Sequence, residues 1–207
     1  MNSALFELSP VTVELFQVHD VLRAVLHTVL FHRCLGVVRP READSGLFEL
    51  TYARVDDAGL EASVEGRIRD ILAWAEENRS ASCATVTLSF FETRQRQGWL
   101  SSSEERMTWE LWRLPLWLVR PAHSHAGEAA AADARAARHT ALEADLKGVL
   151  LHILAAANER RDHLPPVSCA GVVSYPFEIA LSVPNEDAFG VGALSRLVAS
   201  SAPPSLL

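Results

Sequence analysis

The stretch AVLHTVLFHR at residues 24–33 decides the fold. Together with residues 21–23, this stretch has apolar side chains at helical spacing on one broad face. They are Val21, Leu22, Val25, Leu26, Val29 and Leu30. A face this wide predicts a helix that is packed in the middle of the domain. Asp20 is the predicted N-cap residue, and Gly36 and Pro40 are expected to end the helix.

Outward from this helix, the first third of the chain predicts two strands and a second helix. Residues 4–18 alternate approximately between apolar and polar residues, which is typical of a strand, and residues 47–55 predict another strand after a turn-rich loop at 40–46. Residues 57–78 predict a helix, with Glu65 and Arg69 as an i,i+4 ion pair on its solvated face.

Two neighbouring stretches in the middle of the chain predict long strands. Residues 83–91 alternate with a period of two, and a polar loop is expected at 93–106. Residues 107–119 change phase, because Trp109 and Trp112 fall on opposite faces. This phase change predicts either a β-bulge or burial on both faces, and Pro115 favours a position that requires no backbone donor.

The last third of the chain predicts the longest helix and then a strand. An Ala-rich stretch after residue 127 has high helix propensity, and the helix is expected to end near Asn158. Residues 175–183 alternate as a late strand, and 189–198 form a short amphipathic segment. We therefore expect one α+β domain over residues 1–207, with a disordered tail from about residue 200.

Composition and charge exclude several classes of function. The 207 residues are 49% apolar and 22% charged, with a formal net charge of −7 and a single lysine, Lys147. Nucleic-acid binding depends on clustered basic side chains, which the chain lacks, and no polybasic membrane patch is present. Protein partners are therefore expected.

Cysteine usage and hydropathy place the chain in the cytoplasm. Cys34, Cys83 and Cys169 are widely separated and odd in number, so they predict neither a disulfide framework nor a paired metal motif. The amino terminus lacks the features of a signal peptide, and no apolar stretch reaches the roughly 20 residues that span a bilayer. We expect a soluble protein without a cofactor.

Three stretches together resemble the autophagy-related protein 101 family, whose members are HORMA-domain adaptors. They are AVLHTVLFHR at residues 24–33, WELW at 109–112 and NERRDHLP at 158–165, which occur in the family's order and extend over nearly the whole chain. The resemblance implies a meander sheet packed against three helices. It also implies a safety-belt-like region, to which residues 167–207 would correspond.

The resemblance further implies a function and its sites. Such a protein is a non-enzymatic subunit of the autophagy-initiation kinase complex that pairs with the HORMA domain of autophagy-related protein 13, stabilises it and is recruited to the preautophagosomal structure. His32 and Arg33 would lie near that partner. Trp99 would match the tryptophan of an exposed finger that recruits downstream factors, while Leu100 stands where the family has phenylalanine.

The residues alone leave the role of Trp99 open. An apolar pair in a polar loop is either an exposed anchor for a partner or a side chain that folds back onto the domain edge. His27 and His32 are five residues apart, so they do not share a metal ion as an i,i+4 pair does. The sequence favours one histidine in the core and one on the surface.

The sequence contains no complete catalytic site. His123 and His125 supply at most two metal ligands, and no nucleophile elbow or glycine-rich phosphate loop is present. Trp109, Trp112 and Trp117 are assigned to the structure of one strand. Two alternatives remain: a HORMA adaptor of checkpoint or chromosome-axis signalling, and a small metal-dependent hydrolase that uses the two loop histidines.

Overall fold

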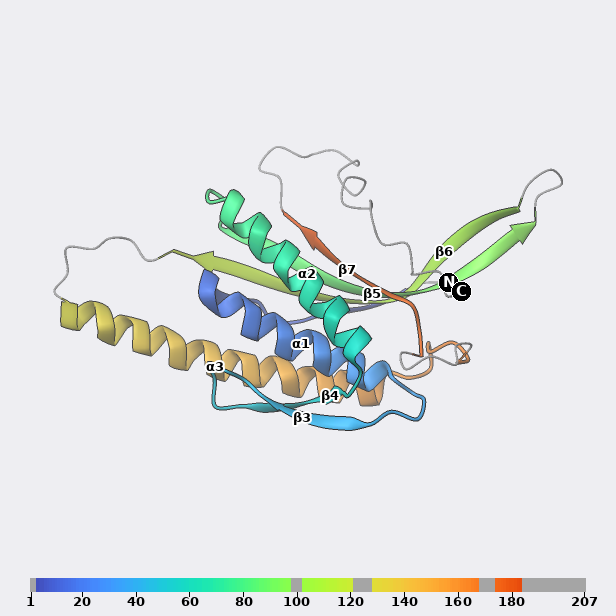
Figure 1. Cartoon of the computed structure of the whole chain (residues 1–207), viewed down its shortest axis with the longest axis horizontal. Helices are drawn as coiled ribbons and strands as arrows, with labels where there is room; N and C mark the ends of the chain where they lie inside the picture. Colours follow the sequence, from blue (N-terminus) through green and yellow to red (C-terminus); the bar gives the residue numbers. More distant parts are fainter. Residues whose placement is uncertain (1–2, 98–101, 121–127, 168–173, 184–207) are drawn as a thin grey trace.

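Three helices cover one face of a mixed β-sheet in the computed structural model, which describes residues 3–97, 102–120, 128–167 and 174–183 (Figure 1). The predicted α+β class is confirmed. The elements, in chain order, are β1 (Ala4–Glu7), β2 (Val11–Glu14), the 3-10 helix η1 (Leu15–Gln17), α1 (Val18–Arg33), β3 (Pro40–Asp44), β4 (Thr51–Val55), α2 (Ala58–Glu77), β5 (Cys83–Gln97), β6 (Ser102–Val119), α3 (Glu128–Glu159) and β7 (Phe177–Ser182).

The main sheet has the strand order β1-β6-β5-β7, and β2 also pairs with β6. Strands β1 and β2 run parallel to β6, whereas the β5–β6 and β5–β7 pairs are antiparallel. The sheet is therefore mixed and is not the simple meander that was predicted. Pro115 lies on β6 between the residues that pair with β1 and those that pair with β2, where its missing N–H is tolerated.

Of the two explanations that the sequence left open for β6, a bulge or burial on both faces, the structure shows the bulge. Phe90 pairs with Glu110, but Phe91 pairs with Thr108, so Trp109 is the extra residue. Because the bulge changes the phase of the strand, Trp109 and Glu110 are both buried although they are consecutive. The bulge thus turns a carboxylate toward the core.

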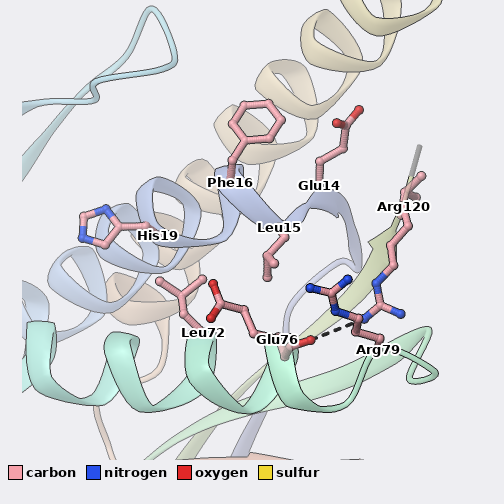
Figure 2. A pocket seen from close by; sticks show the side chains of 10 residues that line it. Glu14, Leu15, Phe16, His19, Leu72, Glu76, Arg79 and Arg120 are labelled. Atoms are coloured by element: carbon pink, nitrogen blue, oxygen red, sulfur yellow. Dashed lines mark hydrogen bonds between the residues drawn. The ribbon is translucent and has the colours of Figure 1, made fainter. Parts of the chain in front are cut away.

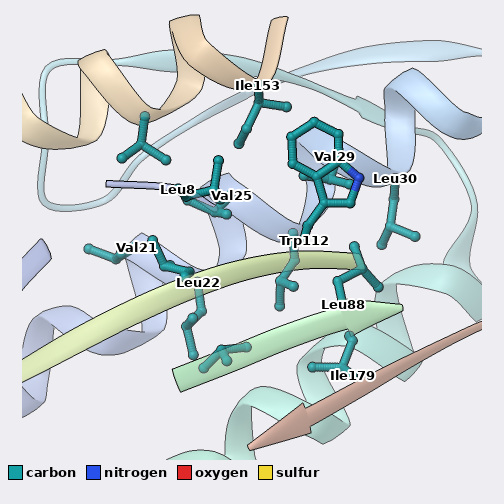
Figure 3. Close-up of a cluster of buried hydrophobic side chains, with 14 of the residues drawn as sticks. Leu8, Val21, Leu22, Val25, Val29, Leu30, Leu88, Trp112, Ile153 and Ile179 are labelled. Atoms are coloured by element: carbon teal, nitrogen blue, oxygen red, sulfur yellow. The ribbon is translucent and has the colours of Figure 1, made fainter. Parts of the chain in front are cut away.

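Helix α1 lies in the middle of the domain, as its broad apolar face predicts. It contacts α2, α3 and β4, and its side chains pack onto the sheet (Figures 1 and 3). Val21, Leu22 and Leu30 are fully buried. Leu22 lines a small internal space together with Leu88 from β5 and Trp112 from β6. Burial on all sides fixes this helix as the element on which the other layers pack.

Two predictions near α1 are wrong in detail. Residues 15–18 are helical, so Asp20 lies in the first turn of α1 and does not cap it. The Asp20 carboxylate instead accepts hydrogen bonds from the backbone N–H of Gly46 at 2.9 Å and from Ser45 Oγ at 3.2 Å. These bonds hold the turn between β3 and β4, and residues 40–44, which were expected to form a loop, are strand β3.

Helix α2 agrees with the prediction except for one ion pair. Asp57 is its N-cap and accepts a hydrogen bond from the Leu60 N–H at 2.7 Å. Glu65 does not pair with the Arg69 guanidinium through its carboxylate; that carboxylate binds Arg23 and His19 of α1, each at 2.9 Å. The supposedly solvated face of α2 therefore contributes to its contact with α1.

The expected loop at 93–106 is much shorter. Strands β5 and β6 stay paired out to Gln97 and Ser102, so the hairpin extends well beyond the helical layer (Figure 1). The long helix ends at Glu159 and β7 lies within the predicted late strand. The amphipathic segment 189–198 and the tail from about residue 200 lie outside the described residues.

His27 is a buried histidine beneath a network of charged side chains. It is 1% exposed, neither ring nitrogen has a hydrogen-bond partner among the described residues, and its ring stacks on Tyr52. Burial, followed by the nearby positive charges of Arg23 and Arg54, lowers the pKa of His27 from 6.5 to about 4. The residue is thus a core histidine, as the sequence favours.

The buried His27 should make stability depend on pH. Between pH 6.5 and about 4, the His27 imidazole is protonated in the unfolded chain but stays neutral in the folded protein. The free energy of unfolding should therefore fall as the pH falls, by about 1.4 kcal/mol per pH unit. Urea denaturation at pH 7, 6 and 5 should show this loss in the wild type and a smaller one in His27→Phe. His152→Gln, which removes an exposed histidine, should retain it; equal slopes for all three would contradict the assignment.

Candidate partner-binding surface

His32 and Arg33 lie at the carboxyl end of α1, but their side chains differ in exposure. His32 is half-buried, and its pKa is lowered by burial and by the neighbouring Arg33 and Arg161. Arg33 is only 1% exposed. Of the two residues predicted to lie near a partner, His32 is therefore the one that a partner could contact directly, and the prediction for both stays a prediction.

The Arg33 side chain forms a buried ion pair with Glu110 of β6. Its Nε donates to both carboxylate oxygens, at 2.8 and 3.0 Å, and its Nη1 donates to the backbone oxygen of Ala157 at 3.2 Å. Nη2 is buried without a partner among the described residues. Glu110 is fully buried, so the pair is shielded from water and each charge depends on the other.

Two further side chains complete the environment of Glu110. The indole N–H of Trp112 donates to Oε1, and His163 Nε2 lies 2.6 Å from Oε2. Phe6 stacks on Trp112 with ring centroids 4.1 Å apart. The carboxylate thus joins β6 to the end of α1 and to the turn that follows α3.

The same region holds the segment that leads into β7. Tyr175 donates its hydroxyl to the backbone oxygen of Pro165 at 2.6 Å, and the N–H of Leu35 donates to Ser174 Oγ at 2.6 Å. The rings of Tyr175 and Trp109 form a T-shaped contact with centroids 4.8 Å apart, and burial raises the pKa of Tyr175. The end of α1, the turn after α3 and the start of β7 are therefore one connected unit.

Apolar side chains are exposed close to this unit. On α3, Leu151 and Leu154 are 67% and 42% exposed and lie three residues apart, on the same face of the helix. After α1, Leu35 and Val37 are also exposed. The hydrogen bond from Arg33 to Ala157 places the ends of α1 and α3 together, so these side chains belong to segments that meet at one end of the helical layer. Exposed apolar patches mark protein-binding surfaces.

Trp99 and Leu100 lie outside the described residues, as do His123 and His125. The chain that connects β5 to β6 begins after Gln97 and ends before Ser102, so the tryptophan belongs to the connection of the extended hairpin. Within the described part of the chain, no three His, Cys, Asp or Glu side chains form a group that could hold a metal ion. No helix there is long and apolar enough to cross a bilayer.

The three tryptophans of β6 have separate structural positions. Trp109 and Trp112 are buried, whereas Trp117 is 50% exposed. Trp117 alternates with the buried Leu116 and therefore points to the opposite face of the sheet. Sequence reasoning missed Glu110, the residue that organises the site. The sequence did contain a signal for Glu110: it is a single carboxylate between two tryptophans of the strand. The apolar alternation of this strand changes phase, which predicted a bulge or burial on both faces.

These features define a class: a small α+β domain with apolar side chains exposed on its helical layer has the surface of a protein-interaction domain. The family model for Autophagy-related protein 101 matches residues 10–170. The chain is 33% identical to Autophagy-related protein 101 of Arabidopsis thaliana over 100% of both chains. The chain therefore belongs to the autophagy-related protein 101 family.

Animal relatives are similar over a shorter part of the chain. Autophagy-related protein 101 of Xenopus laevis is 27% identical and that of Homo sapiens is 28% identical, each over 55% of this chain and 57% of the relative. The predicted family is thus confirmed, and with it a role in autophagy.

The buried pair predicts an asymmetric response to substitution. Glu110→Leu should lower the free energy of unfolding by about 3–5 kcal/mol, because it leaves the Arg33 charge buried without a counterion. The double variant Glu110→Leu with Arg33→Met should recover much of this loss, as an apolar pair replaces the ions. Urea denaturation measures both; strictly additive losses would show that the two side chains do not interact.

Proposed function

We propose that this chain is a non-enzymatic HORMA adaptor of the autophagy-initiation kinase complex, which pairs with and stabilises the HORMA domain of autophagy-related protein 13. The family membership and the compatible arrangement of three helices on a mixed sheet support this proposal. The protein acts in the cytoplasm and is recruited to the preautophagosomal structure. It works through shape and exposed anchors, without cofactor or metal.

The observation that carries the pairing is the exposed apolar surface of α3 beside the end of α1. Leu151 and Leu154 expose large apolar side chains to water. Covering them with a partner protein would be favourable, because apolar surface would leave water. His32 lies at the same end and adds a polar contact, while Arg33 acts as a positioning residue through Glu110. We therefore assign the partner's HORMA domain to this surface.

The extended β5–β6 hairpin supports the second part of the proposal. Its pairing continues to Gln97 and Ser102, beyond the helical layer (Figure 1). In this proposal Trp99, which follows in the sequence, enters a pocket of a recruited autophagy factor. Residues 167–207 would supply the safety-belt-like region.

A HORMA adaptor of checkpoint or chromosome-axis signalling is the second reading of the fold. Family membership favours autophagy over those pathways. The metal-dependent hydrolase has no support in the described residues, where no group of potential ligands is found.

Co-expression with the HORMA domain of autophagy-related protein 13 should give a one-to-one complex in size-exclusion chromatography with light scattering. Leu151→Glu with Leu154→Glu should weaken that complex at least tenfold, because two charges enter a buried apolar contact. Ala134→Glu with Ala137→Glu is the matched control, since it adds the same charges at the same spacing on an exposed part of α3. Equal effects of the two double variants, or no complex at all, would refute the assigned surface.

Trp99→Ala should strongly weaken recruitment without lowering the stability of the domain. Loss of an aromatic hot spot costs about 2 kcal/mol or more of binding free energy, which is roughly thirtyfold in affinity. The complex with the HORMA partner would be used to pull down autophagy factors, and a melting curve would be recorded for each protein. A lower melting temperature would instead assign Trp99 to the domain's own packing. Leu100→Phe should strengthen recruitment if the family's phenylalanine makes the better contact.

A further inference from the structure

A concave site lies at the opposite end of α1 from His32. It is a pocket of about 540 Å³ between η1 with the start of α1, the carboxyl end of α2 and the end of β6 (Figure 2). A pocket of this volume is within the range of small-ligand and side-chain binding sites. None of the residues assigned above to partner binding lines it.

The pocket has apolar walls. Leu15 from η1 points toward Leu72 of α2, whereas the ring of Phe16 points away from α2 (Figure 2). Ala75 of α2 and Val119 of β6 complete the apolar lining. Phe16 is 58% exposed, although an aromatic ring gains free energy by leaving water. A partner segment that lies on the pocket and on its rim would cover part of this ring.

Two arginines lie at one side of the pocket. Arg120 donates from Nη2 to the backbone oxygens of Ala75 and Asn78, at 3.4 and 3.3 Å, and so occupies the carbonyl end of α2. Arg79 has no carboxylate partner among the described residues, and its guanidinium lies on the same side as that of Arg120 (Figure 2). Two guanidinium groups so placed favour a shared anion.

The other charged residues of the lining offset this positive charge only in part. The Glu14 carboxylate is bound by Arg138 at 3.1 Å, and His19 is bound to Glu65 at 2.9 Å. Glu76 is the remaining carboxylate, and within the described part of the chain no ion pair engages it. The pocket therefore keeps one more unpaired cation than anion.

From this combination of walls and charges we propose that the pocket binds a segment of a partner protein that carries an apolar side chain next to a carboxylate. The apolar side chain enters between η1 and α2, and the carboxylate contacts Arg79 and Arg120. This site is additional to the proposed HORMA pairing and to the finger, because it lies at the other end of α1.

A peptide fits these observations better than a membrane surface. Apart from Phe16, the apolar side chains line a concave site and do not form a protruding ridge. The chain also carries a net charge of −7, which disfavours approach to anionic lipid. A bilayer would therefore contact Phe16 and leave most of the pocket unused.

The test uses the full chain, labelled with ¹⁵N, and three synthetic peptides of equal length. The first carries phenylalanine followed by two glutamates in a Gly/Ser background; the second has lysines in place of the glutamates; the third has serine in place of phenylalanine. The first peptide should shift backbone resonances of η1, the end of α2 and the end of β6. The other two should bind at least tenfold more weakly in fluorescence anisotropy titrations.

Variants separate the site from general effects of charge. Arg79→Glu should weaken binding of the first peptide about tenfold or more, whereas Arg135→Glu, the same change on an exposed part of α3, should not alter it. Glu76→Gln should tighten binding, because it removes the competing carboxylate, and a gain of affinity cannot arise from misfolding.

Three results would overturn the proposal. They are equal binding of the acidic and basic peptides, resonance shifts that map elsewhere on the domain, and the absence of binding by any peptide. Sedimentation with phospholipid vesicles of neutral and anionic composition is measured in parallel. Vesicle binding that depends on Phe16 and Arg79, without peptide binding, would make the region a membrane contact instead.

Discussion

The buried carboxylate of Glu110 is the constraint on which the arrangement of this domain depends. A carboxylate that leaves water loses several kcal/mol of hydration free energy, which only close partners can replace. Here the partners are Arg33, Trp112 and His163, which come from three different parts of the chain. Any movement of α1 relative to β6 would break the pair and leave both charges without compensation.

Helix α1 is consequently fixed by different interactions at its two ends. At its start, Asp20 and Arg23 bind the β3–β4 turn and α2 through polar contacts that water reaches in part. At its end, Arg33 is shielded from solvent. Because screening is weak in a shielded environment, the end near His32 should be the more rigidly held of the two.

The sequence predicts the periodic elements of the fold well. Helices α1, α2 and α3 and strands β5 to β7 follow from apolar patterns that are long enough to distinguish a period of 3.6 from a period of two. It fails at residues 40–44, where exposed charged residues form strand β3. That strand is held by pairing with β4 and by the Asp20 contact, neither of which a local pattern contains.

The candidate site was predictable only in part, for a related reason. The motif at residues 24–33 identifies the end of α1, yet it does not reveal that His32 is accessible while Arg33 is buried. That difference depends on Glu110, which is 77 residues away and reaches the core only because of the bulge at Trp109. The phase change predicted either a bulge or burial on both faces, but the strand pattern could not specify what the displaced carboxylate binds.

The position of α1 also determines how the two proposed surfaces relate to each other. The helix has 16 residues and therefore spans about 24 Å, with the pocket at its start and the exposed leucines of α3 near its end. Sites this far apart bind independently unless an element with two arrangements connects them. Helix α1 is packed on all sides and is a poor candidate for such an element.

The network of Arg33, Glu110 and His163 is a better candidate for an element that couples the two surfaces. Of these three side chains only His163 is partly exposed, and it joins the network to the turn after α3. Coupling between partners, if it is measured, should therefore depend on His163 more than on any residue of the helical core.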